Sequence, residues 1–172
     1  SVVSSDGKKT IVQMGSGYRG DLWLARSGKG KVVNVTPADY RYFAIKVGFK
    51  SQLVPGKNKP NGCIKLEIFD DGIKKIGPEY FGTGGDANNR YEILGASEIS
   101  TTEPNVLYYD LQSKYKTVTP TDWNQVFDLA QCKFVIADFP ETAQTYDLYW
   151  IRSFKSIEEL QAFVDSENNT NE

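Results

Sequence analysis

Residues 146–165, YDLYWIRSFKSIEELQAFVD, contain the two patterns that decide the fold. Residues 146–154 alternate and are rich in aromatic and branched side chains, which is typical of a β-strand. Ser156 and Glu159 then have the spacing of a capping box, in which each side chain satisfies the other's backbone N–H. Apolar residues follow at helical spacing, so we predict a helix over 156–165 that docks on a sheet.

The rest of the chain consists of short strand-like runs separated by Gly, Pro, Asn and Asp. Residues 121–130 are either a loop or a short helical turn. The many short strands with such turns predict an all-β fold, a jelly-roll β-sandwich with one short C-terminal helix. Besides 146–154, the predicted strands are 10–14, 21–26, 31–35, 40–49, 63–69, 72–76, 90–94, 105–111 and 133–139.

The length fits a single domain spanning residues 1–172, with flexible tails expected at 1–9 and 166–172. Hydrophobic residues make up 40% and charged residues 24%, as in a globular domain with a real core. Because the sequence begins with Ser and has no signal peptide, we expect a processed product or a domain cut from a larger protein.

The composition excludes several kinds of chemistry. Histidine is absent, which rules out Ser-His-Asp and Cys-His catalysis and histidine-ligated zinc or haem. The 20 basic and 22 acidic residues argue against nucleic-acid binding, which needs a basic surplus. No apolar run is long enough for a membrane span. Cys63 and Cys132 are two buried thiols, or a bridge between neighbouring strands if the protein is exported.

Two apparent catalytic or ligand motifs have simpler explanations. Residues 15–20, GSGYRG, match G-x-G-x-x-G, but a strand-like run follows them. A pyrophosphate loop must open a helix, so we interpret this stretch as a glycine-rich turn. A glycosidase needs two carboxylates across a sugar. No pair with a recognisable motif exists among the available glutamates, Glu67, Glu79, Glu92 and Glu98.

Alternation places aromatic residues on both faces of several predicted strands. An aromatic side chain on the outer face of a sandwich needs a cover, which is a loop, the C-terminal helix or a ligand. The predicted core faces carry Phe43, Ile45, Val47, Ile64, Leu66, Ile68, Leu107, Tyr109, Leu111, Tyr149 and Ile151. The predicted outer faces carry Tyr40, Tyr42, Ala44, Lys46, Lys65, Glu67, Phe69, Val106, Tyr108, Asp110, Tyr146, Leu148, Trp150, Arg152 and Phe154.

This mixture of residues suits carbohydrate binding. A pyranose ring has an apolar face of C–H groups and a rim of hydroxyls, and Tyr and Trp combine a flat apolar body with a polar tip. Charged side chains beside them make strong hydrogen bonds to hydroxyls. We therefore predict an aromatic-lined groove. Its candidate binding residues are Trp23, Trp123, Trp150, Arg152, Tyr42, Tyr91, Tyr108 and Glu67.

The three tryptophans have alternatives that stay open. Trp23 stands between two leucines and fits the core as well as a groove. Trp150 fits beneath the C-terminal helix as well as in a groove. Trp123 stands in a polar run, which favours an exposed loop and hence a binding role.

Three stretches resemble the xylan-binding modules found inside or beside family-ten xylanases of gut bacteria. They are PADYRYFAIK at 37–46, KLEIFDDG at 65–72 and YDLYWIRSFKS at 146–156. More loosely, the chain is similar to β-sandwich carbohydrate-binding modules of families four, nine and twenty-two. The resemblance covers most of the chain.

The resemblance implies a jelly-roll sandwich that binds plant cell-wall polysaccharide, above all xylan, without catalysis. It also implies export to the cell surface and attachment to a glycoside hydrolase. No cofactor is expected; relatives often hold a structural calcium ion, but this sequence has no matching ligand motif. Two other functions stay open: a jelly-roll glycoside hydrolase with a carboxylate pair, and a structural or interaction sandwich of a larger protein.

Overall fold

The computed structural model describes residues 2–13, 20–25, 33–35, 39–52, 64–70, 75–82, 91–111, 127–136 and 144–169. In chain order the elements are β1 (Val2–Ser5), β2 (Thr10–Gln13), β3 (Gly20–Ala25), β4 (Val33–Val35), β5 (Tyr42–Phe49), β6 (Ile64–Asp70), β7 (Lys75–Gly82), β8 (Glu92–Ile93), β9 (Asn105–Asp110), β10 (Phe127–Ile136), β11 (Thr145–Phe154) and α1 (Ile157–Asn169).

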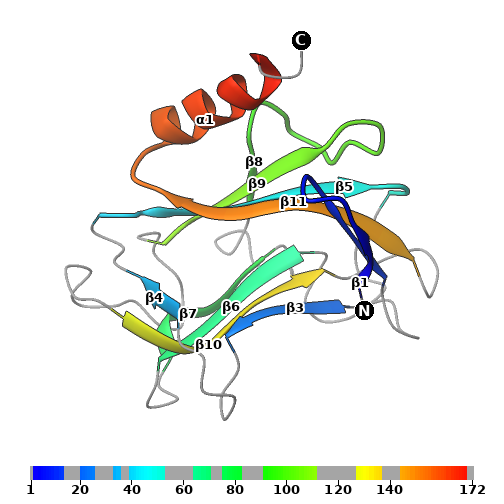
Figure 1. Cartoon of the computed structure of the whole chain (residues 1–172). Helices are drawn as coiled ribbons and strands as arrows, with labels where there is room; N and C mark the ends of the chain where they lie inside the picture. The colour runs from blue at the N-terminus through cyan, green and yellow to red at the C-terminus, as the bar shows by residue number, and fades with distance from the viewer. Residues whose placement is uncertain are drawn as a thin grey trace.

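The strands form two antiparallel sheets that face each other, with α1 on the outer face of one of them (Figure 1). The six-stranded sheet has the order β1-β2-β11-β5-β9-β8. The five-stranded sheet has the order β3-β10-β6-β7, and β4 also pairs with β10. The all-β class with a C-terminal helix is confirmed, and the jelly-roll order of connections stays a prediction.

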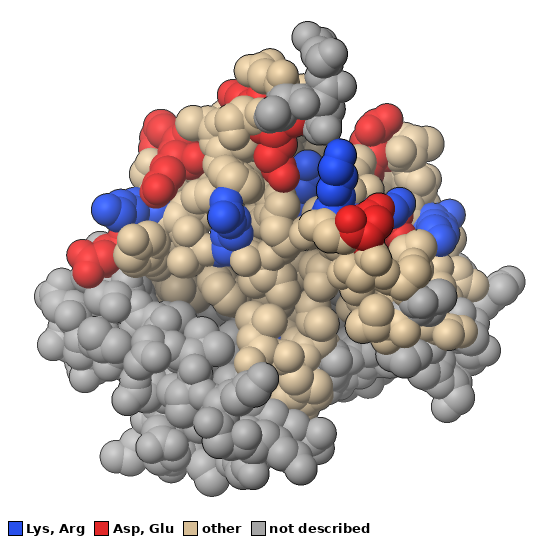
Figure 2. All heavy atoms as spheres, in the orientation of Figure 1, with Lys and Arg blue, Asp and Glu red and all other residues tan. Residues whose placement is uncertain are grey.

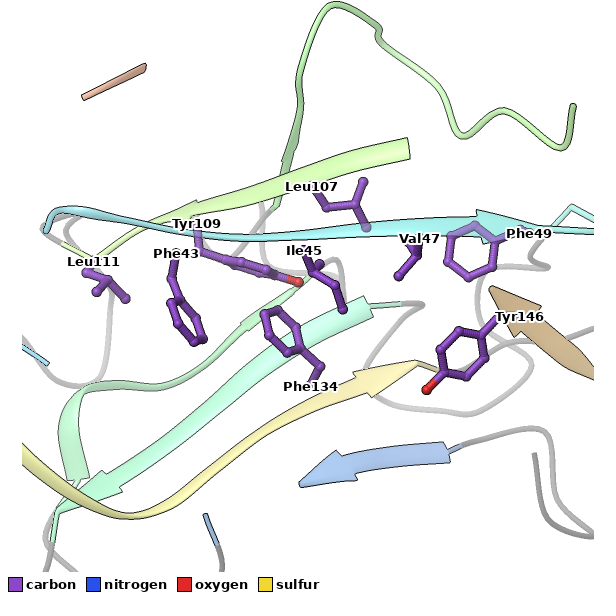
Figure 3. Packing of buried hydrophobic residues seen from close by; sticks show 9 residues of the cluster. All are labelled: Phe43, Ile45, Val47, Phe49, Leu107, Tyr109, Leu111, Phe134 and Tyr146. Carbon is purple, nitrogen blue, oxygen red and sulfur yellow. The ribbon is translucent and has the colours of Figure 1, made fainter. Parts of the chain in front are cut away.

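The main core lies between the sheets (Figure 3). Side chains of β5 and β9 point toward Phe134 of β10, whose ring stacks on Phe43 with centroids 5.6 Å apart. Alternation predicts this face of β5 and β9 because successive side chains point to opposite sides of a sheet. The confirmed buried positions are Phe43, Ile45, Val47, Leu107, Tyr109 and Leu111.

An irregularity in β11 changes which of its side chains reach the core. The pairing with β5 shifts between Leu148 and Trp150, so Tyr149 is an extra residue that reverses the alternation. Tyr146 is only 2% exposed and belongs to the inter-sheet core, and Leu148 packs against it. The predictions that these two residues lie outside and that Tyr149 lies in the core are therefore wrong. Ile151 packs on the core as expected.

Several strands and the helix extend beyond their predicted limits. β1 pairs with β2 inside the tail expected at 1–9, and α1 continues to Asn169 inside the tail expected at 166–172. β10 already begins at Phe127, where a loop or helical turn was expected, because its first residues pair with β4. The ladder hydrogen bonds offered by a neighbouring strand override weak local propensity.

The helix begins at the predicted place with one of the two expected capping-box hydrogen bonds, while the Glu159 side chain bonds the backbone N–H of Lys155 instead of that of Ser156. The Glu159 backbone N–H donates to Ser156 Oγ at 3.2 Å, and Glu159 Oε2 accepts the Lys155 backbone N–H at 2.7 Å. Leu160 is fully buried against Val106 and its neighbours on the sheet. Val106, predicted to face outward, is thus buried under α1. Within the described ranges, no helix is long and apolar enough to cross a membrane.

Candidate functional site

The structure separates the predicted binding residues into different places. The outer face of the six-stranded sheet carries two tyrosines together with Trp150 and Arg152. Trp23 and Glu67 belong to strands of the five-stranded sheet. Tyr91 packs on the inter-sheet core. Trp123 lies outside the described residues, so its predicted role stays a prediction.

One half of this outer face is covered by the helix. The Trp150 ring meets that of Phe163 edge-on at 5.4 Å, and its indole N–H donates to Glu167 Oε1 at 2.9 Å. The other oxygen of Glu167 accepts from Lys46 Nζ at 3.0 Å. We call Lys46, Trp150, Phe154, Phe163 and Glu167 the covered half. Of the two alternatives for Trp150, the structure shows packing beneath the C-terminal helix.

The other half carries Tyr42 of β5 and Tyr108 of β9. Their rings pack edge to face, with centroids 6.0 Å apart and planes at 76°. Both side chains are half-buried. Across the described ranges, neither phenol hydroxyl has a hydrogen-bond partner within the protein. Two aromatic bodies thus stand beside two hydroxyls that are available to a ligand.

Arg41 and Asp110 form a rigid polar wall next to these rings. Arg41 Nε and Nη2 donate to the two Asp110 carboxylate oxygens at 2.7 Å and 2.6 Å. This fork-to-fork pair raises the pKa of Arg41 and holds Asp110 as an acceptor. The Arg41 side chain is 43% exposed and also lies 5.3 Å from the Tyr42 ring centroid. Its remaining N–H groups can donate to a ligand.

Glu92 of β8 completes this polar rim. It is exposed and pairs directly opposite Tyr108 in the sheet register. Burial raises the pKa of Tyr108, and the nearby Glu92, Tyr42 and Asp110 add to that shift. The phenol therefore stays a neutral donor well above neutral pH. We call Arg41, Tyr42, Glu92, Tyr108 and Asp110 the tyrosine shelf.

Sequence reasoning found the two tyrosines of the shelf but missed Arg41 and Asp110 as site residues. Asp110 shares a face with Tyr108 through ordinary strand alternation, so that pattern contained a usable signal. Arg41 precedes β5, where alternation gives no guidance. Its place follows only from the pairing of β5 with β9, which continues where the Leu111 N–H donates to the Arg41 carbonyl at 2.9 Å.

The five-stranded sheet has its own mixed row. The register aligns Trp23, Lys133, Glu67 and Tyr80 across four neighbouring strands. Lys133 Nζ lies 4.6 Å from the Trp23 ring centroid, a cation–π contact. Lys133 is only 7% exposed, however, whereas Arg41 of the shelf is 43% exposed. Lys133 is therefore closed to solvent, and the shelf, with its partly exposed Arg41 and exposed Glu92, is the candidate site.

Tyr91 does not join either surface. It packs against the core between the sheets together with Ile93. It also lines a pocket of about 470 Å³ formed with the turn that follows β8. Tyr91 therefore lies on the core side of the six-stranded sheet, whereas Tyr108 lies on its outer face.

A family described as "Domain of unknown function (DUF4979)" matches residues 1–160. The chain belongs to this DUF4979 family. No curated protein and no solved structure matches it. In the part of the chain that the structure describes, no three His, Cys, Asp or Glu side chains gather as a metal site, so the calcium ion implied by the resemblance stays a prediction.

Proposed function

We propose that this chain is a non-catalytic carbohydrate-binding module that binds plant cell-wall polysaccharide, above all xylan, through the tyrosine shelf. The observation that carries this proposal is the Tyr42–Tyr108 pair at 6.0 Å with free hydroxyls, flanked by the Arg41–Asp110 fork. The resemblance of three stretches of sequence to xylan-binding modules supports the same class of ligand.

The mechanism is stacking combined with hydrogen bonding, and no bond is broken. The C–H face of a pyranose ring packs on an exposed aromatic face, while its hydroxyls meet the phenols, the Arg41 fork and the Glu92 carboxylate. Arg41 and Asp110 hold each other in place before ligand arrives, which lowers the entropy cost of binding. A shelf this shallow gains little free energy per sugar, so modest affinity is expected.

The proposed role is to keep an attached glycoside hydrolase near its substrate. Binding raises the effective concentration of the catalytic domain on the polymer without any new contact to the bond that is cleaved. This role requires export, with the module at the bacterial cell surface or outside the cell.

Native affinity electrophoresis tests the proposal. The protein runs through gels that contain xylan, mannan, β-glucan, pectin or starch, alongside Tyr108→Ala and its matched control Tyr91→Ala. Both variants truncate half-buried tyrosines at the same sheet edge, but only Tyr108 belongs to the shelf. We expect xylan to retard the wild type and Tyr91→Ala, and not Tyr108→Ala. No retardation in any gel, or sustained release of reducing ends from xylan by the pure chain, overturns the proposal.

A further inference from the structure

A second concave surface lies on the far flank of α1 from the tyrosine shelf. It is a groove of about 610 Å³ lined by Arg152, Ser153 and Phe154 of β11 and by Glu159, Ala162 and Phe163 of α1. The register places Arg152 and Tyr108 on either side of Ala44, which is fully buried in the cluster that contains Leu160 of α1. The helix therefore separates the groove from the shelf.

The groove lies along a part of β11 where sheet pairing is incomplete. β2 pairs with β11 only as far as Leu148, and β5 alone among the described strands pairs with it from Trp150 to Phe154. Ser153 is accordingly exposed. In Figure 2, acidic side chains gather over the helix, and both basic and acidic side chains lie in the band below it.

Arg152 is the distinctive group of this groove. It is exposed, and its guanidinium carbon lies 4.4 Å from the Phe163 ring centroid. Within the described ranges, the Phe163 ring is the only interaction partner of this guanidinium, and its N–H donors have no carboxylate partner there. Arg41 and Lys46, on the same sheet face, are both paired with carboxylates at 3.0 Å or less. Stacking therefore holds the Arg152 fork in place with its donors unused.

We propose that this groove binds a uronic acid residue, a sugar ring that carries a carboxylate. A guanidinium fork donates two parallel hydrogen bonds to a carboxylate, which is the pairing that Arg152 lacks. Ser153 also lines the groove, beside a stretch of β11 that only β5 pairs with among the described strands. Glu159 lines the same groove, but its Oε2 accepts the Lys155 backbone N–H at 2.7 Å, and within the described ranges it makes no ion pair with Arg152.

This inference rests on the proposed function and deepens it, because it names the substrate class as a glycan with acidic sugar units. The shelf then contacts neutral sugars of the polymer and the groove contacts acidic ones. A polymer that bears uronic acid groups reaches both sites on one module or on neighbouring copies. The two contacts together increase the avidity.

Two-dimensional NMR of the ¹⁵N-labelled protein tests this inference site by site. Sodium glucuronate, methyl glucoside and xylohexaose are titrated separately into the wild type, Arg152→Gln and Lys155→Gln. Lys155 is the matched control because it is an exposed cation next to the same helix terminus, stacked on Tyr40 at 5.5 Å. We expect glucuronate, and not methyl glucoside, to shift the amide signals of Ser153, Ala162 and Phe163. Arg152→Gln weakens this binding about tenfold or more, and Lys155→Gln changes it by less than about twofold.

The shelf amides separate this inference from the proposed function. If xylohexaose shifts Tyr108 and Asp110 while glucuronate leaves the groove signals unmoved, the uronic acid site is overturned and the proposed function stands. If glucuronate shifts the groove and xylohexaose leaves the shelf unmoved, the acidic-sugar site stands and the shelf is not the polysaccharide site. Equal loss of glucuronate binding in Arg152→Gln and Lys155→Gln would mean that general charge attraction accounts for the binding, and would overturn the proposed uronic acid site.

Discussion

The two halves of the outer face of the six-stranded sheet carry the same kinds of residue and use them differently. In the covered half, an aromatic ring, a lysine and a carboxylate close on one another: Trp150 and Lys46 both donate to Glu167. In the tyrosine shelf, the described residues offer the aromatic hydroxyls no such partner, and Arg41 of the Arg41–Asp110 pair lies 5.3 Å from the Tyr42 ring centroid.

The difference teaches that residue type alone does not separate packing from binding. The position of α1 decides it: the helix supplies Phe163 and Glu167 to the covered half, whereas Tyr42 and Tyr108 pack only partly buried against the cluster that contains Leu160. Mutations in the covered half should therefore change stability, and mutations in the shelf should change ligand binding.

The largest expected effect on stability comes from Trp150→Ala. This change removes the edge-on contacts with Phe154 and Phe163 and leaves Glu167 without its indole donor. Truncating a large aromatic in such a setting costs about 3 kcal/mol. Urea unfolding followed by fluorescence or circular dichroism measures it, and Trp150→Phe, which keeps a ring, should lose less. A variant as stable as the wild type would show that α1 does not close this half.

The buried Tyr146 makes the free energy of unfolding depend on pH. Burial raises the pKa of Tyr146 from 10.0 to about 12. The folded state therefore keeps the proton while the unfolded chain loses it, so stability is complete below about pH 10 and falls as pH rises toward 12. The loss amounts to about 2–3 kcal/mol, at roughly 1.4 kcal/mol per pKa unit.

Unfolding free energies from pH 9 to 12 check this slope in the wild type, Tyr146→Phe and Tyr40→Phe. The phenylalanine at 146 has no proton to lose and should flatten the curve, whereas Tyr40 is 42% exposed and its replacement should leave the slope unchanged. The same slope in all three proteins would contradict the burial of the Tyr146 hydroxyl.

A smaller effect is expected from Glu167→Gln. The substitution removes the negative charge that faces Lys46, whose side chain is 14% exposed, but keeps an acceptor for the Trp150 N–H. A half-buried ammonium that loses its charged partner costs about 1–2 kcal/mol. Thermal unfolding at low and high salt reads this out, with Asp165→Gln on the exposed side of α1 as the control. An unchanged melting temperature would mean that the pair adds nothing to the covered half.

The smallest effect on stability is expected from Tyr108→Ala, even though it should abolish retention by xylan. Tyr108 is half-buried, and its ring has Tyr42 as its aromatic neighbour, so its truncation costs about 1 kcal/mol. Urea unfolding together with affinity electrophoresis separates the two quantities. Parallel loss of stability and binding would place Tyr108 in the packing of the sheet rather than in a ligand site.

Much of the fold could be predicted from the sequence, because alternation and turn residues are local signals. The β5 and β9 core faces and the capped start of α1 follow directly from them. Two features could not be predicted. The bulge at Tyr149 follows from pairing with β5, and β10 begins early because β4 lies beside it. Both depend on partners that are distant in the sequence.

The candidate site was predictable in kind and not in place. The residue types of an aromatic groove were visible, but Trp150 and Tyr108 have similar strand patterns and different ring partners, Phe163 of α1 for Trp150 and Tyr42 of β5 for Tyr108. Only the docking of α1 distinguishes them. The proximity of Arg41 to Asp110 links positions 69 residues apart, which no local pattern reports.

The central claim is tested most directly by isothermal titration calorimetry of xylohexaose into three proteins: the wild type, the double variant Tyr42→Ala/Tyr108→Ala, and Trp23→Ala. The double variant removes the rings of the shelf, and Trp23→Ala removes the tryptophan that contacts Lys133 on the five-stranded sheet. The account predicts that the double variant loses measurable binding and that Trp23→Ala retains the wild-type affinity. Binding that survives in the double variant and disappears in Trp23→Ala would contradict it and move the groove to the five-stranded sheet.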